Sequence, residues 1–279
     1  MKSMINRIRQ RVCTRLQVKD NFEYDSFKLP VKLVNMTGGG IETWEAISRN
    51  HMELHRKYLD ISPEQNILEI GCGIGRDAIQ FSKYLSEKGQ YTGIDIIWES
   101  INWCKLNISS RFPNFKFIYL DIYSQIHNPW GALQVTDIDL PVKDSTVDRI
   151  ILHSVFTHMF FDDIVHYMKQ FKRILKPSGK IYTSMFLVKN KTLALVRSGK
   201  TPCDLTFSHD FDEGCYVESL EAPEGAVAYS EKRFADMLSV SGLELDRDIC
   251  WGSWTGQQGV VSGQDVVILR RVQAPNEGE

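Results

Sequence analysis

The sequence predicts an α/β fold with a parallel sheet that is covered by helices on both faces. Residues 66–70 (NILEI) form a short apolar run of the kind found in strands that are buried on both sides. A glycine-rich turn at 71–75 (GCGIG) follows, and helical spacing of apolar residues resumes at 78–85. Further apolar runs alternate with helical segments up to residue 186, which is typical of a chain that builds a parallel sheet.

The size and composition fit a globular protein with one large domain. The chain has 279 residues, of which 43% are hydrophobic and 24% are charged, so it can bury a full core. The formal net charge of −2 gives no general attraction to nucleic acid, and we expect no nucleic-acid partner. No apolar run approaches the roughly 20 residues that cross a bilayer, and the N-terminus lacks the apolar segment of a secretory signal. These observations predict a cytoplasmic protein.

The cysteines and histidines give no sign of a metal site in the sequence. The six cysteines are scattered and include no C-x-x-C pair, so we expect reduced thiols and no zinc site. His51 and His55 lie four residues apart in a predicted helix at 42–59 and share a face of it. The sequence points to no third ligand beside them. We therefore expect surface histidines and no bound metal.

The glycine turn is the strongest functional feature of the sequence. Gly71, Gly73 and Gly75 remove side chains where the chain turns tightly, and they let a ligand approach the backbone. The next predicted strand ends in Asp95, about 20 residues beyond the glycines, where a carboxylate can bind ribose hydroxyls. Glu69 stands before the turn, where its charge disfavours a pyrophosphate and tolerates a ligand with a cationic centre.

Four segments together resemble class I methyltransferases that use S-adenosylmethionine (SAM). Residues 68–75 (LEIGCGIG) resemble the first motif of this family, and residues 93–96 (GIDI) resemble its ribose-binding motif. Residues 140–148 (LPVKDSTVD) and 175–181 (LKPSGKI) resemble two later signatures, and all four occur in the expected order. The resemblance covers about residues 42–271. It implies a Rossmann-like sheet of seven strands in the order 3-2-1-4-5-7-6, with SAM as cofactor and S-adenosylhomocysteine (SAH) as product.

The resemblance also implies roles for individual residues. Asp95 would bind the cofactor ribose, and His153 would lie near the methionine part. His158 is the expected base if a hydroxyl is methylated, and the alternative is that it caps a helix or orders a loop. Cys72 and Asp121 also have simpler alternatives, as a small turn residue and a turn-capping acid. The predicted cofactor-binding residues are Glu69, Gly71, Cys72, Gly73, Gly75, Asp95, Ile96, Asp121, Ile122 and His153.

The predicted methyltransferase domain spans residues 42–271 and carries additions. Residues 1–41 are predicted to be a basic extension followed by a loop, and residues 272–279 a tail. The first 19 residues have the spacing of a basic amphipathic helix, which either contacts an anionic membrane surface or packs on the domain or on a second subunit. Residues 187–229 interrupt the pattern and are predicted to be an insertion that caps the substrate site. The sequence does not predict an oligomeric state.

The expected reaction is transfer of the SAM methyl group to an oxygen of a small-molecule or glycan-like acceptor. The segment SVFTHM at 154–159 and the closing residues 252–269 resemble bacterial members linked to polysaccharide and glycolipid assembly. A loop at 251–259, rich in glycine and tryptophan, either stacks on a sugar or planar ligand or packs its indoles. Alternatives are a lipid, quinone or natural-product acceptor, and a protein that binds SAM without turnover. A dinucleotide oxidoreductase is the rival at the level of the fold, and Glu69 disfavours it.

Overall fold

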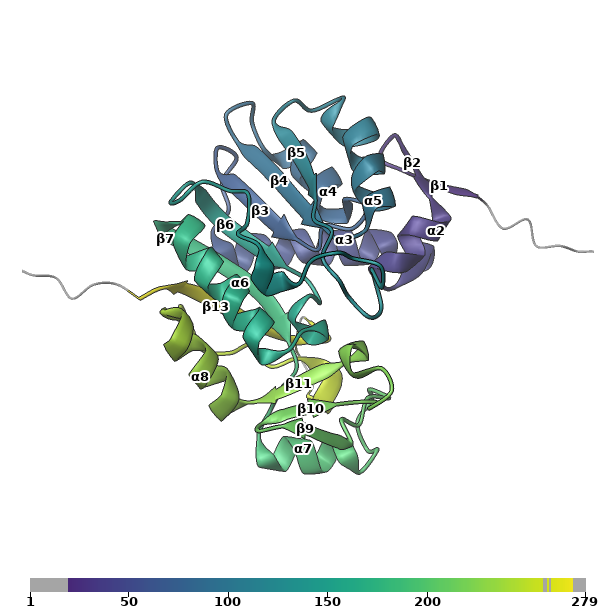
Figure 1. Ribbon diagram of the computed structural model, residues 1–279. Coiled ribbons are helices and arrows are strands. Elements are labelled where there is room, and N and C mark those ends of the chain that lie inside the picture. Colours follow the sequence, from purple (N-terminus) through teal and green to yellow (C-terminus); the bar gives the residue numbers. More distant parts are fainter. Residues whose placement is uncertain (1–19, 258–259, 261, 273–279) are drawn as a thin grey trace, which may run out of the picture.

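The computed structural model describes residues 20–257, 260 and 262–272, so the basic helix predicted at 1–19 lies outside the described residues. A sheet of seven strands forms the centre, in the order β12-β13-β7-β6-β3-β4-β5 (Figure 1). This order confirms the predicted fold class and strand arrangement. The strands are β3 (Asn66–Ile70), β4 (Gln90–Asp95), β5 (Phe115–Tyr119), β6 (Val147–Leu152), β7 (Leu175–Met185), β12 (Leu243–Leu245) and β13 (Asp265–Arg271).

Strand β3 lies in the middle of the sheet and pairs in parallel with β4 and β6. Its apolar side chains alternate between two cores: Ile67 packs in one hydrophobic cluster, whereas Leu68 and Ile70 pack in the other. Both faces are therefore buried, which explains the apolar run in the sequence. Strand β13 runs antiparallel between β7 and β12, and β12 forms one edge of the sheet.

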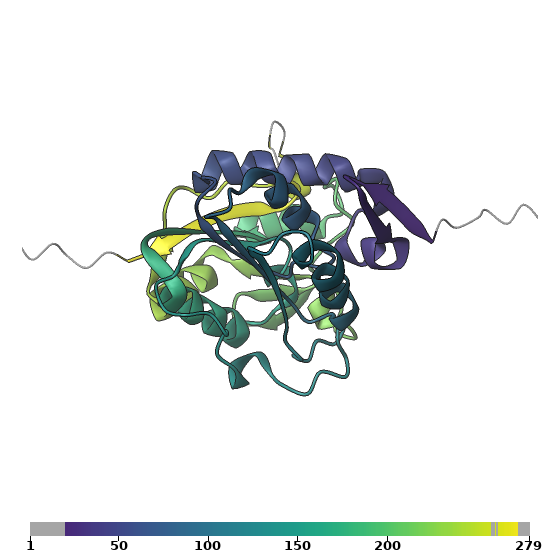
Figure 2. The ribbon, with the colours of Figure 1, turned by 90° about the horizontal axis from the view of Figure 1, so that it is seen from above.

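Helices cover both faces of this sheet, as the sequence predicts. Trp44 and Phe81 belong to the cluster on one face, and Met168 and Phe234 belong to the cluster on the other. Figure 2 shows α3 lying lengthwise along one side of the molecule. On the first face lie α3 (Gly40–Leu59), α4 (Arg76–Tyr84) and α5 (Trp98–Cys104), which continues as a π-helical turn (Lys105–Ser109); on the second lie α6 (Phe161–Ile174) and α8 (Glu231–Ser241). None of the helices in the described residues is long and apolar enough to cross a membrane.

The prediction of a loop before α3 is wrong for residues 21–34, because these residues form a hairpin and a short helix. Phe27 and Leu29 are buried, and Asp25 and Ser26 both have positive φ angles, of 49° and 65°. Two consecutive residues with positive φ form a tight hairpin turn whose twist matches that of the flanking strands. The alternating apolar residues on either side of this turn therefore belong to two paired strands. The elements are β1 (Asn21–Tyr24), β2 (Phe27–Pro30), α2 (Val31–Val34) and a 3₁₀ turn (Asn35–Thr37).

The segment LKPSGKI at 175–181 lies entirely within strand β7. Strand β7 includes Lys176 and Gly179, but its pairing with β6 is interrupted there. The register passes from the pair Val147 and Leu175 directly to the pair Arg149 and Lys180. The extra residues of β7 form a bulged stretch, so proline and glycine interrupt the ladder without reversing the chain.

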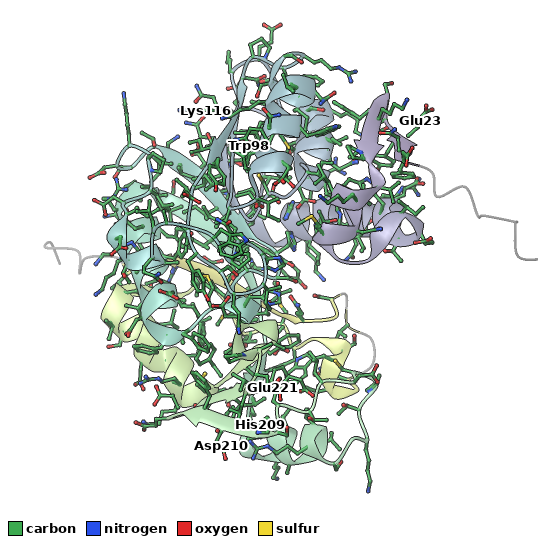
Figure 3. All side chains as sticks on the ribbon, turned by 45° about the vertical axis from the view of Figure 1, so that its right-hand side comes forward. Glu23, Trp98, Lys116, His209, Asp210 and Glu221 are labelled. Carbon is green, nitrogen blue, oxygen red and sulfur yellow. The ribbon has the colours of Figure 1, made fainter. Side chains whose placement is uncertain are left out.

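The predicted insertion at 187–229 folds into a second layer with a sheet of its own. Four strands pair in the order β8-β11-β10-β9, and Val188 and Ala228 of this sheet pack with Phe207 and Trp254 in a separate core. Figure 3 shows His209, Asp210 and Glu221 on this layer, at the opposite end of the molecule from Lys116. The elements are β8 (Leu187–Val188), α7 (Asn190–Arg197), β9 (His209–Asp212), β10 (Cys215–Val217), a 3₁₀ turn (Pro223–Gly225) and β11 (Val227–Ser230).

Asp265 joins the second layer to the central sheet. Its carboxylate is fully buried at the start of β13 and accepts hydrogen bonds from the backbone N–H of Gly252 (2.7 Å) and of Leu187 (2.8 Å). The indole N–H of Trp254 donates a third bond at 2.9 Å. Three donors from two segments thus meet on one side chain, which fixes β8 and the loop after β12 against β13.

Replacing Asp265 with alanine is expected to lower the free energy of unfolding by about 3 kcal/mol. The change leaves three buried donors without an acceptor, and each such loss costs roughly 1–3 kcal/mol, partly offset because a buried carboxylate is removed. Urea denaturation followed by circular dichroism measures the effect. Asp204→Ala, at an exposed position in the same layer, is the matched control and should stay within about 0.5 kcal/mol of the unmodified protein. Equal free energies of unfolding for the two variants would show that Asp265 does not stabilise the contact between the second layer and the central sheet.

The same carboxylate predicts a pH dependence of stability. Burial raises the pKa of Asp265 to about 6 from an ordinary value of 3.8, against the three hydrogen bonds that lower it. The folded state therefore holds this proton more tightly than the unfolded state, so the stability from this group is complete below about pH 4 and falls as the pH rises through 6. Asp265→Asn cannot titrate. Relative to the unmodified protein, this variant should gain about 2 kcal/mol between pH 4.5 and pH 7.5 in urea denaturation. If the stabilities of the two proteins change in parallel with pH, the raised pKa of Asp265 is contradicted.

Candidate active site

A cavity of about 540 Å³ lies at the carboxyl-terminal ends of the central parallel strands. The turn after β3, the end of β4 and the segment after β6 all contribute to its wall. The second layer contributes Leu205, Glu224 and Gly225, and the chain before α3 contributes Thr37 and Gly38. Strand order reverses around β3, and ligands bind at such a point in open α/β sheets. The fold therefore places the cavity where a cofactor site is expected.

The glycine turn leaves no room for larger residues. Gly71 and Gly73 line the cavity with positive φ angles of 75° and 50°. A Cβ atom on Gly71 would lie 2.6 Å from Val155 Cγ2, and one on Gly73 would lie 2.9 Å from Thr37 Cγ2. Cys72 is buried between them, and burial raises the pKa of its thiol well above the ordinary value. A neutral thiol fits the simpler interpretation of Cys72 as a small residue in the turn.

Asp95 ends β4 and holds the glycine turn in place. Its Oδ2 accepts a hydrogen bond from Gly73 N at 2.7 Å, and its Oδ1 accepts one from Ile97 N at 2.8 Å. Burial raises the pKa of Asp95, and these backbone bonds oppose the rise. The carboxylate lines the cavity beside Ile96 and Ile122. It is thus held by backbone N–H groups on both of its oxygens at the wall of the cavity.

Two predicted residues do not belong to the described wall of the cavity. Gly75 instead packs on α5 and the π-helical turn, because its Cβ would lie 2.7 Å from Ile108 Cδ1. The carboxylate of Asp121 accepts a hydrogen bond from the Tyr119 hydroxyl at 2.6 Å and one from the Asn128 amide at 3.3 Å. These contacts agree with the alternative in which Asp121 orders the loop after β5.

The charges around the cavity are strongly unbalanced. Among the described residues that line it, five are acidic and Arg76 is the single lysine or arginine. Burial raises the pKa of Glu69 well above its ordinary value, with Asp77 and Asp95 adding to the rise. The Tyr91 hydroxyl donates a hydrogen bond to Glu69. A cavity of this kind favours a ligand with a positive centre over a polyphosphate.

Arg76 is a site residue to which the sequence assigned no role. Its guanidinium donates hydrogen bonds to the carbonyl oxygens of Thr37 (2.9 Å) and Gly38 (2.7 Å) and lies over the indole of Trp44, 4.8 Å from the ring centroid. It therefore fastens the segment before α3 to the rim of the cavity. In the sequence, only the position of Arg76 directly after the glycine turn indicates that it belongs to the site.

His158 lines the cavity with a defined tautomer. It ends a 3₁₀ turn (Phe156–His158) after β6, and its Nδ1 lies 2.8 Å from the carbonyl oxygen of Glu224 in the second layer. Because a carbonyl only accepts hydrogen bonds, the proton of a neutral imidazole lies on Nδ1 here, and its lone pair lies on Nε2. The second layer thus orients the predicted base.

The sequence expectation for the histidines of α3 is wrong. His55 is fully buried and His51 is only partly exposed, with 14% of its side chain accessible. Both lie beside Asp77 and His153, two residues that the sequence did not place near them. Burial lowers the pKa of His55 to about 4, and it lowers that of His153 well below its ordinary value.

Two buried hydroxyl groups face the cavity without a hydrogen-bond partner among the described residues. They belong to Ser100, in the first turn of α5, and to Thr157, next to His158. Buried hydroxyls are normally paired, so both are candidates for ligand contacts. The described residues of the loop after β12 include no unpartnered buried hydroxyl group. Trp254 packs on Phe186 and Phe207, which favours the interpretation of packed indoles over a sugar platform.

The fold and cavity define the class of SAM-dependent class I methyltransferases. A family model described as "Methyltransferase domain" matches residues 61–232, which is more than half of the chain. The chain belongs to this family, and SAM is the methyl donor of its class.

Individual relatives agree with this assignment at low identity. The chain is 31% identical over 67 residues to the probable cobalt-precorrin-6B C(15)-methyltransferase (decarboxylating) of Thermoplasma acidophilum, covering 23% of this chain and 33% of that protein. It is 22% identical over 142 residues to the 2-phytyl-1,4-naphtoquinone methyltransferase of Trichormus variabilis, covering 50% of this chain and 56% of that protein. The matches thus span less than two thirds of either relative.

A solved structure, of a SAM-dependent methyltransferase from Methanosarcina mazei, has the same fold. It superimposes with a TM-score of 0.51 at 20% identity over 79% of this chain and 98% of that chain. At this identity the likeness concerns the fold alone.

Proposed function

We propose that this chain transfers the methyl group of SAM to an oxygen atom of a small-molecule or glycan-like acceptor. The observation that carries the proposal is the excess of acidic over basic residues in the described wall of the cavity, five against one arginine. A sulfonium cation is stabilised in such surroundings, whereas the pyrophosphate of a dinucleotide is repelled.

The residues of the cavity fit this cofactor. Asp95 would accept hydrogen bonds from the ribose hydroxyls, and the unpartnered hydroxyl of Ser100 lies in the first turn of the helix that follows Asp95. The backbone of Gly71 and Gly73 would approach the cofactor closely, and Glu69 would face the amino group of its methionine part. When bound, SAM supplies an activated methyl group, so the protein has to align the acceptor and exclude water.

His158 would take the proton of an acceptor hydroxyl. Its Nδ1 proton is held by the Glu224 carbonyl, which leaves a basic Nε2 on an imidazole that lines the cavity. Thr157 would provide a hydrogen bond that orients the acceptor, because its buried hydroxyl has no partner among the described residues. The layer formed by residues 187–229 would cap the acceptor, since it both orients His158 and contributes to the wall.

A quinone or lipid-like scaffold is the second candidate acceptor. Phe160, Phe186 and Leu205 give part of the wall an apolar character. One relative is named as a methyltransferase of a phytylated naphthoquinone. An apolar ring or chain would bury these side chains, whereas a glycan would use the acidic ones.

Incubation with SAM and acceptor panels tests the proposal. Release of SAH, together with a product heavier by one CH2 group in mass spectrometry, is expected with one acceptor class. Sugar and glycolipid extracts form one panel, and quinones and lipids form the other. SAM binding without SAH release from any panel would favour the alternative of a protein that binds SAM without turnover.

A further inference from the structure

Three residues from distant parts of the chain meet on one side of the cavity. His51 comes from α3, Asp77 from the first turn of α4 and His153 from the residue after β6. One ligand atom of each lies within 4.8 Å of the other two. His51 Nδ1 lies 2.9 Å from Asp77 Oδ1, and His153 Nε2 lies 3.5 Å from Asp77 Oδ2. All three residues line the cavity.

The distances between these donor atoms match those between neighbouring ligands of a transition metal. The rings of His51 and His153 stack with 3.5 Å between centroids and 3° between planes, so one ring has to rotate for both to bind the same ion. Bonds of about 2.0–2.2 Å from a metal to nitrogen and oxygen place adjacent donors roughly 3–3.5 Å apart. Two imidazoles and one carboxylate are a donor set that suits zinc and ferrous iron, and three protein ligands leave further coordination positions open. The carboxylate also supplies the negative charge that a buried dication needs.

We propose that His51, Asp77 and His153 bind a divalent transition-metal ion whose open positions face the cavity. The site shares His153 with the predicted cofactor-binding residues, and it uses none of the residues assigned to the ribose or to the acceptor base. The three protein ligands lie on a helix, at the start of a helix and at the end of a strand, which are rigid elements of the fold. The open coordination positions can then contact either the bound cofactor or the acceptor.

His55 is the positioning residue of this site. It is fully buried, with its Nε2 2.9 Å from His153 Nε2 and 3.9 Å from Asp77 Oδ2. Each imidazole nitrogen has one lone pair or one proton, so a metal on His153 Nε2 replaces the bond from His55. The freed N–H of His55 then turns to the carboxylate of Asp77, which orients that ligand as outer partners do in metal sites.

Metal binding by the full chain tests the proposal. Protein treated with EDTA is dialysed against micromolar Zn²⁺, and bound metal is measured by mass spectrometry of the elements; Co²⁺ replaces Zn²⁺ for absorption spectra. We expect about one ion per chain and visible cobalt bands. His51→Gln and Asp77→Asn should both lose stoichiometric binding, and His55→Ala should weaken it about 10–100-fold.

His166→Ala is the matched control, because this histidine lies on α6 and hydrogen-bonds to the carbonyl oxygen of Ile138. It should bind metal as the unmodified protein does. Circular dichroism verifies that each variant is folded, and His51→Gln, at a partly exposed position of α3, keeps the test open if Asp77→Asn does not fold. Absence of binding to the unmodified protein, or equal binding by His51→Gln, would overturn the site. A SAM titration of metal-free protein reports separately on the proposed function.

Discussion

Replacing Asp95 with alanine is expected to weaken SAM binding about 100-fold or more. Hydrogen bonds to a charged acceptor contribute roughly 1.5–3 kcal/mol each, and the ribose would make two of them. The substitution also removes the acceptor that holds Gly73 N and Ile97 N, so the glycine turn loses its fixed shape. Both effects act on the same ligand. Isothermal titration calorimetry with SAM measures the loss.

Asp121→Ala is the control for this experiment. Its carboxylate lies in the next βα loop but bonds to Tyr119 and Asn128. We expect the affinity of this variant for SAM to change less than about threefold, since no hydrogen bond to the cofactor is lost. An Asp95→Ala protein that is folded and binds SAM as tightly as the unmodified protein would show that the cofactor assignment is wrong.

Replacing His158 with alanine is expected to lower kcat about 10²–10⁴-fold with little change in SAM affinity. A positioned general base contributes rate enhancement of this order, and the substituted side chain is assigned to the acceptor rather than to the cofactor. The rate of SAH formation with a saturating acceptor gives kcat, and calorimetry gives the affinity. If kcat is unchanged, the histidine only orders the loop through its bond to Glu224, as the simpler alternative holds.

Two controls separate these explanations. His166→Ala removes a histidine of α6 that is bonded to Ile138 and should leave kcat unchanged. His158→Gln retains a side chain that can hydrogen-bond to the Glu224 carbonyl but cannot act as a base. It should therefore be as slow as His158→Ala. Recovery of activity in the glutamine variant would assign His158 a structural role.

The central part of the fold was predictable because its signals are local. The apolar residues of β3, the glycines of the turn and Asp95 at the end of β4 are each specified within a few residues of sequence. Strand pairing then brings them together by the rules of parallel sheets, without further information from the side chains. The cofactor end of the cavity follows from these few elements.

The remaining features depend on contacts between distant segments. The helical spacing of His51 indicates which face it shares but not that Asp77 and His153 pack against that face. Asp265 likewise joins segments that have no common sequence pattern. The hairpin before α3 had a local signal, but two non-glycine residues with positive φ are uncommon enough to hide its turn.

Calorimetric titration of the unmodified protein with SAM, and in parallel with NAD⁺, tests the central claim most directly. An acidic cavity with a ribose-binding Asp95 predicts one site per chain for SAM with micromolar affinity, and no detectable heat with NAD⁺. Binding of NAD⁺ in the absence of SAM binding would contradict the account, because it would require the acidic wall around Glu69 to accept a pyrophosphate.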